Sequence, residues 1–217
     1  MNKMLDLTTR DLLNEFGKGT GMTGAGASAA LGAIAATQIL LSVCKLTTAK
    51  EKYATVHGPL QEIQEQLENK YLAMLEGIMQ ADAATIENML RLRSLRDGET
   101  DAEKKEILKQ QAAKTLEGAA ATMLKLCSTC LEIMPMAIQV HDTGLKSAQG
   151  DVIMAFSGLL SSASSGLYAC LINIRAAKDA TWTTKIQEQV HTAYGRLHEY
   201  RHIFSGKLEV LYTKTLG

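Results

Sequence analysis

Apolar residues recur at helical spacing along most of this chain. In the longest run they follow one another from Leu60 almost to Gly98, which predicts a helix of about 35 residues. No segment sustains the apolar–polar alternation of a half-buried strand. β-Sandwiches and β-barrels are rich in turn residues such as proline and in aromatic residues within their strands. Here only 2 of the 217 residues are proline and 5% are aromatic. The sequence therefore predicts an all-α fold.

Start and stop signals predict further helices. Capping boxes at Thr8–Asp11 and Thr100–Glu103 each open a helix, and we expect Pro135 to break or kink the second one. Apolar composition predicts three more helices, at residues 29–46, 152–174 and 182–212. No repeat or linker divides the chain, so we expect residues 1–217 to form a single bundle-like domain of several long helices.

Two stretches of the chain carry no charge, at residues 19–44 and 152–174. The second is long enough to cross a bilayer at about 1.5 Å per residue. It contains five serines, and it lacks an aromatic belt and a one-sided basic flank. A helix that is apolar on all sides can also be buried in a protein core or in an interface between subunits. We therefore expect buried helices rather than membrane spans.

Charge and cysteine content indicate which partners, cellular compartment and metal content to expect. Lys and Arg number 23 and Asp and Glu also number 23, so the formal net charge is zero. Because no excess of positive charge attracts a polyanion, we expect neither nucleic acid nor an acidic membrane as a partner. The first residues carry charges and contain no apolar run, so they do not form a signal peptide. The four cysteines are consistent with free thiols in a reducing compartment, and we therefore expect a cytoplasmic protein. Cys127 and Cys130 have Cys-x-x-Cys spacing without further ligands in reach, so we expect no metal.

The most unusual segment is rich in glycine. Residues 17–26 contain five glycines and precede the alanine-rich helix. A glycine loop that enters a helix N-terminus exposes backbone N–H groups and the positive end of the helix dipole, which together form an anion site. The same glycines also suit a flexible connection or the close packing of two helices.

The order of motifs around this loop resembles the formiminotransferase-cyclodeaminase family. Asp6-Leu7-Thr8 precedes the loop, and Leu46-Thr47-Thr48 begins a stretch that ends at Lys52-Tyr53. Four later segments are also similar to the family: residues 80–84, 100–104, 150–155 and 172–174. The resemblance covers nearly the whole chain, and it is closest to the cyclodeaminase domain and to the free-standing methenyltetrahydrofolate cyclohydrolases.

This resemblance implies an all-helical homodimer that acts on a one-carbon tetrahydrofolate and uses no metal. The cyclodeaminase closes 5-formiminotetrahydrofolate to 5,10-methenyltetrahydrofolate and releases ammonia, and the cyclohydrolase adds water to the methenyl carbon. Both reactions pass through a tetrahedral carbon between two nitrogens and need a proton shuttle. We expect no formiminotransferase half before residue 1.

The resemblance also suggests site residues. Asp82 and Asp151 are the candidate catalytic carboxylates, because each lies in an apolar helical context that raises a carboxyl pKa; a helix cap or a solvated carboxylate is the alternative for each. Candidate substrate-binding residues in the loop and near the chain's basic groups are Thr23, Gly24, Gly26, Ser28, Lys50, Lys52, Arg91, Arg93 and Asn173. The four basic residues suit the glutamate tail of a folate, or else form a solvated face.

Several positions depart from the family pattern. The family's loop proline and two of its glycines are replaced in Thr23–Ser28, Gly150 stands where a serine is usual, and Ile153 stands where a glycine is usual. Two alternatives to a folate enzyme therefore stay open. One is a non-catalytic relative that acts as a dimeric interaction protein, and the other is an enzyme for a different small ligand.

Overall fold

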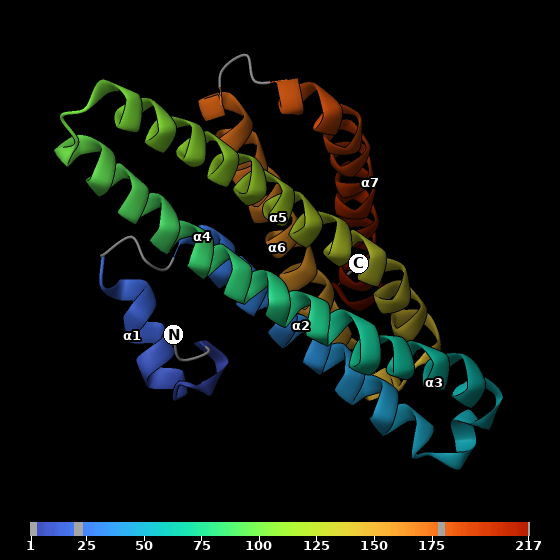
Figure 1. Cartoon of the computed structure of the whole chain (residues 1–217). Coiled ribbons are helices and arrows are strands. Elements are labelled where there is room, and N and C mark those ends of the chain that lie inside the picture. The colour runs from blue at the N-terminus through green and yellow to red at the C-terminus, as the bar shows by residue number, and fades with distance from the viewer. Residues whose placement is uncertain (1–3, 20–23, 178–180, 217) are drawn as a thin grey trace.

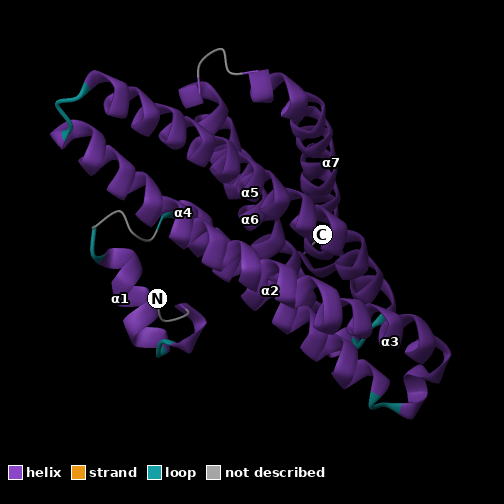
Figure 2. Cartoon of the chain, viewed as in Figure 1, coloured by secondary structure: helices purple, strands orange, loops and turns teal. Residues whose placement is uncertain are grey.

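The computed structural model describes residues 4–19, 24–177 and 181–216, which form helices joined by short loops (Figures 1 and 2). The helices are α1 (Thr9–Gly17), α2 (Ala25–Thr48), α3 (His57–Gln66), α4 (Leu72–Gly98), α5 (Ala102–Thr143), α6 (Gln149–Ala177) and α7 (Thr181–Leu216). A π-helical turn, η3 (Leu67–Tyr71), joins α3 to α4, and short 3₁₀ turns occupy Met4–Asp6, Glu51–Val56 (η2) and Lys146–Ala148 (η4). None of the described residues lies in a strand, so the all-α prediction is confirmed.

Local chemistry explains where two of the helices begin. The Thr8 hydroxyl accepts from the Asp11 N–H at 3.2 Å and caps α1, as the first capping box predicted. The cap of α5 is Asp101, one residue later than the second box predicted. Its carboxylate accepts from the N–H groups of Glu103 and Lys104 at 2.9 and 3.1 Å.

Of the two expected effects of Pro135, a break or a kink, the break is wrong. α5 continues through this proline to Thr143, and the Pro135 ring lies on an exposed side of the helix. Tertiary packing on both sides holds the helix together, because Met134 and Ala137 are buried. The segment between the expected helices at 29–46 and 60–98 is also helical in part, since residues 51–56 form the turn η2.

Close helix packing builds the core from α2, α4, α5 and α6. A Cβ atom on Gly166 of α6 would lie 2.9 Å from the Met123 carbonyl oxygen of α5. α2 and α6 also approach closely, because a Cβ atom on Gly158 would lie 3.0 Å from the Cβ of Ala36. The small residues of the uncharged α6 thus let it pack between two neighbours.

Three helices are long and apolar enough to cross a membrane by length and composition alone. They are α2, α5 and the segment Lys146–Ala177 that contains α6, and about half of each apolar window is buried inside the bundle. Packing against neighbouring helices accounts for the apolar character of those buried halves.

Gly166 supplies a stability prediction. Gly166→Ala should lower the free energy of unfolding by about 1–3 kcal/mol, because the added methyl group meets backbone atoms of α5 that cannot move aside. Gly118→Ala in α5 is the matched control, since a Cβ atom there meets nothing within 4 Å and alanine favours a helix by up to about 1 kcal/mol. Urea denaturation measures both. Equal effects of the two substitutions would contradict close α5–α6 packing.

Candidate functional site at the start of α2

Asp82 of α4 faces the first turn of α2. Its side chain is buried, with the residue only 7% exposed, and its carboxylate accepts from the backbone N–H of Ala27. The N-cap residue of α2, Gly24, supplies no side-chain hydrogen bond. Asp82 therefore takes the place of the usual capping side chain, from a neighbouring helix.

Two glycines make room for this contact. A Cβ atom on Gly26 would lie 2.5 to 2.6 Å from three atoms of the Asp82 carboxyl group. A Cβ atom on Gly24 would lie 2.8 Å from Cδ1 of Ile86, one turn after Asp82. At these positions glycine serves close helix packing, one of the alternatives left open by the sequence. The positive end of α2 meets a carboxylate of the chain itself.

The Asp82 carboxyl group is electrostatically unusual. Burial raises its pKa above the ordinary aspartate value, and the hydrogen bond from Ala27 lowers it by less. Its Oδ2 atom is buried and has no hydrogen-bond partner among the described residues, and neither has Nε2 of Gln80. A buried carboxyl group with a raised pKa and one unpartnered oxygen is suited to proton transfer to a ligand.

Asp151 lies elsewhere in the bundle. The Leu145 N–H donates to Thr47 Oγ1 at 3.0 Å, which places the segment before α6 beside the C-terminal end of α2. Asp151 is in the first turn of α6, close to that segment. α2 has 24 residues, so its ends are roughly 36 Å apart at about 1.5 Å per residue. One chain therefore does not bring Asp82 and Asp151 into the same site.

The apolar surroundings expected for Asp151 are also wrong. Its side chain is exposed, because it lies on the solvent side of the first turn of α6. Lys50 and Lys52 are exposed at the same end of the bundle, and Lys52 Nζ lies 5.1 Å from the centre of the Tyr53 ring. These two lysines are remote from Asp82, at the other end of α2.

The remaining candidates are dispersed around the Asp82 end. Ser28 is exposed and its hydroxyl donates to the Ala25 carbonyl at 3.0 Å, while Thr23 lies outside the described residues. Asn173 is half-buried in the last turns of α6. Arg93 is exposed, and Arg91 lines a groove between α4 and α5. Of the candidates in the described chain, only Gly24 and Gly26 lie at the Asp82 contact.

Sequence reasoning missed the partners of Asp82. The donor is a backbone N–H, which no side-chain motif marks. Ile86 follows Asp82 at i, i+4 spacing, and this spacing was a usable signal that both side chains point to one neighbour.

The cysteines and other metal-ligating side chains form no site in the described chain. No group of three or more His, Cys, Asp or Glu side chains is placed to hold a metal ion in residues 4–19, 24–177 and 181–216. All four cysteines are buried free thiols. Burial raises the pKa of Cys44 and of Cys127 to about 12, and that of Cys170 to about 11. Thiols with such pKa values are poor nucleophiles at neutral pH.

Comparison with known proteins gives the chain a family. The formiminotransferase-cyclodeaminase family model matches residues 8–192. The crystal structure of a formiminotetrahydrofolate cyclodeaminase from Thermotoga maritima superposes with a TM-score of 0.79, covering 94% of this chain and 97% of that chain at 16% sequence identity. No curated protein sequence matches the chain. Because the family model spans most of the sequence and the helical fold agrees, the chain belongs to the formiminotransferase-cyclodeaminase family.

Proposed function

We propose that the chain is a tetrahydrofolate one-carbon enzyme, a formiminotetrahydrofolate cyclodeaminase or a methenyltetrahydrofolate cyclohydrolase. Its membership of the family and its helical fold support this class of substrate. The observation that carries the proposal is the Asp82 carboxyl group, which is buried against the start of α2 and has an unpartnered oxygen.

Asp82 suits the proton transfers of both reactions. In the cyclodeaminase direction, N10 attacks the formimino carbon, and the tetrahedral intermediate must lose its amino group. A protonated Asp82 donates the proton that lets this nitrogen leave as ammonia, which is why a raised pKa matters. In the cyclohydrolase direction, the Asp82 carboxylate takes a proton from the water that adds to the methenyl carbon and then gives it to N5. The C–N5 bond breaks, and the hydroxyl group on the carbon loses its proton to water as the 10-formyl carbonyl forms.

The two reactions give opposite optical signals. With 5-formiminotetrahydrofolate, cyclodeamination raises the ultraviolet absorbance of 5,10-methenyltetrahydrofolate and releases one ammonium ion for each turnover. With 5,10-methenyltetrahydrofolate, hydrolysis removes the same absorbance. Purified protein should accelerate one of these changes over the spontaneous rate. If neither changes and calorimetry detects no folate binding, the chain is instead an interaction protein or acts on another ligand.

We also propose that the protein is a cytoplasmic homodimer. α2 and α6 pack side by side, and residues 25–44 of α2 and 152–174 of α6 contain no charged side chain. The exposed stripe on α2 includes Ala35 and Ser42, and that on α6 includes Ser161 and Tyr168. At about 1.5 Å per residue these two segments are about 30 and 35 Å long, and with a width of about 10 Å each they present roughly 650 Å², close to the area that one partner buries in a stable interface.

A charge on this face tests the dimer. Ala35→Glu should convert the dimer to a monomer, because the carboxylate would be buried without a partner between the two subunits. Light scattering coupled to size-exclusion chromatography measures the mass. Gln61→Glu on α3 is the control, since it adds the same charge at an exposed position on another helix. A wild-type monomer at micromolar concentration would contradict the dimer.

A further inference from the structure

The ends of α4 and α5 form a polar arm that the proposed reaction does not use. Figure 1 shows the two helices running side by side to a short loop, past the start of α2. In residues 90–118 only Leu92 is buried, so this part of the hairpin has almost no hydrophobic core. A seam between two helices is ordinarily apolar, and the polar seam observed here needs another explanation.

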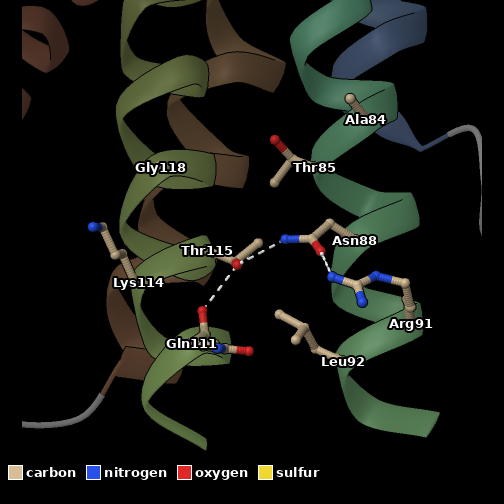
Figure 3. A pocket seen from close by; sticks show the side chains of 9 residues that line it. All are labelled: Ala84, Thr85, Asn88, Arg91, Leu92, Gln111, Lys114, Thr115 and Gly118. Carbon is tan, nitrogen blue, oxygen red and sulfur yellow. Dashed lines mark hydrogen bonds between the residues drawn. The ribbon is translucent and has the colours of Figure 1, made fainter. Parts of the chain in front are cut away.

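A hydrogen-bond chain crosses this seam. Arg91 Nη2 donates to Asn88 Oδ1 at 2.9 Å, and Asn88 Nδ2 donates to Thr115 Oγ1 at 3.2 Å. The Thr115 hydroxyl in turn donates to the Gln111 carbonyl at 2.9 Å. Figure 3 shows Asn88 reaching from α4 to Thr115 on α5, with the Arg91 guanidinium beside it. These hydrogen bonds fix the Asn88 amide and orient Arg91, while most of the guanidinium N–H groups remain free to donate.

The same residues line a groove of about 590 Å³ between the two helices. Hydroxyl groups of Thr85 and Thr115 and amides of Asn88 and Gln111 face it, and its lining contains no acidic residue. Its charged residues are Arg91 and Lys114; in Figure 3 the Lys114 side chain extends from the outer side of α5, as a charge at the rim.

Among the described residues, two cations of the arm pair with carboxylates, whereas the cations of the groove do not. Arg96 pairs with Asp97 at 2.8 Å, and Lys109 pairs with Glu106 at 3.1 Å. Arg91 and Lys114 form no ion pair with any described residue, and neither does Arg93. Arg91 differs from Arg93 in its position in the groove and in its hydrogen bond to Asn88. An oriented guanidinium with free donors and no carboxylate partner matches the planar, bidentate geometry of a carboxylate or phosphate group.

We propose that the groove between α4 and α5 binds a small anion with carboxylate or phosphate groups, at a site separate from Asp82. Asp82 faces α2, whereas Asn88 faces α5, and Arg91 lies nine residues further along α4, roughly 13 Å at about 1.5 Å per residue. The proposal therefore stands without the folate reaction. Arg91 is the anchor, and Lys114 adds charge at the rim. The Thr85 and Thr115 hydroxyls already donate to the Ala81 and Gln111 carbonyls, so the remaining anion oxygens accept from the second N–H of the Asn88 amide and from the Gln111 amide.

Titration with inorganic phosphate and with citrate tests this site and distinguishes the two chemistries. The titrations are followed by calorimetry at low ionic strength, with chloride at matched ionic strength as the reference. We expect saturable binding of at least one of the two anions, and Arg91→Ala should weaken it about tenfold or more. Arg93→Ala is the matched control, because Arg93 carries the same charge two residues away but does not line the groove. It should change binding by less than about twofold.

A second variant blocks the groove without removing a charge. A Cβ atom on Gly118 meets nothing within 4 Å, so Gly118→Leu should fill the groove and abolish binding while the unfolding temperature is maintained. Three results would overturn the proposal: absence of saturable binding of either anion, equal losses in Arg91→Ala and Arg93→Ala, or unchanged binding in a folded Gly118→Leu variant.

Discussion

Asp82→Asn is expected to lower kcat for the folate reaction by about 10²- to 10⁴-fold and to leave the helical bundle intact. Asparagine has nearly the same shape as aspartate, and its amide oxygen can still accept from the Ala27 N–H, so α2 keeps its cap. It has no carboxyl proton to transfer, and only the chemistry is lost. Initial rates measured by ammonium release and by methenyl absorbance test this, with circular dichroism to confirm folding.

A comparison with Asp151 makes this result specific to Asp82. Asp151→Asn removes an exposed carboxylate at the far end of α2. Within one chain it lies too far from Asp82 to share a catalytic step, so its effect should be much smaller. If Asp151→Asn were the inactive variant and Asp82→Asn kept full activity, the proposed role of Asp82 would be wrong.

Asp82→Asn should also change how stability depends on pH. Because burial raises the carboxyl pKa, the folded chain holds this proton more tightly than the unfolded chain does. The contribution of Asp82 to stability is full below the unfolded-state pKa of about 3.9 and is lost as pH rises through the folded-state pKa. Asparagine does not titrate, so the variant should gain unfolding temperature relative to the wild type as pH rises from about 4.

Gly26→Ala is expected to have the second largest effect, a loss of activity of about tenfold or more together with a fall in stability of about 1–3 kcal/mol. The added methyl group would lie 2.5 to 2.6 Å from the Asp82 carboxyl atoms, so the carboxyl group must leave its place at the start of α2. The Ala27 N–H then loses its acceptor, and the proton donor moves away from its bound position. Kinetics and urea denaturation measure the two effects.

Gly24→Ala is the control for this substitution. Its methyl group would meet Cδ1 of Ile86 at 2.8 Å, which is the flexible end of a side chain and can move aside. The carboxyl group of Asp82 would stay in place, so activity should fall much less than in Gly26→Ala. Equal losses in the two variants would show that the loop, and not the contact with Asp82, governs activity.

Much of the fold was predictable because helical periodicity is a local property. The helices α1, α2, α6 and α7 were expected within a few residues of their bounds, and the Thr8 cap was identified correctly. The continuation of α5 through Pro135 was not predicted, because burial on either side of the proline stabilises a helix that local propensity would end. The π-helical turn Leu67–Tyr71 could not be predicted either, because the apolar pattern of the flanking helices continues through it without interruption.

The candidate site was less predictable because it depends on tertiary contacts. Asp82 stood out in sequence by its apolar context, and burial does raise its pKa. Asp151 lay in a similar context, but its position in the first turn of α6 turns it to solvent. The direction of a side chain at a helix end depends on how the bundle packs, which one sequence pattern does not specify.

Titration of the Asp82 carboxyl group tests the central claim most directly. Carbon-13 NMR of aspartate-labelled protein, with the Asp82 resonance assigned from the Asp82→Asn spectrum, gives its pKa with and without a stable tetrahydrofolate such as 5-formyltetrahydrofolate. We expect a pKa above the ordinary aspartate value of about 3.9, and a shift of this resonance when the folate binds. A pKa at or below the ordinary value, with no response of the resonance to the folate, would contradict a role for Asp82 in proton transfer to a folate.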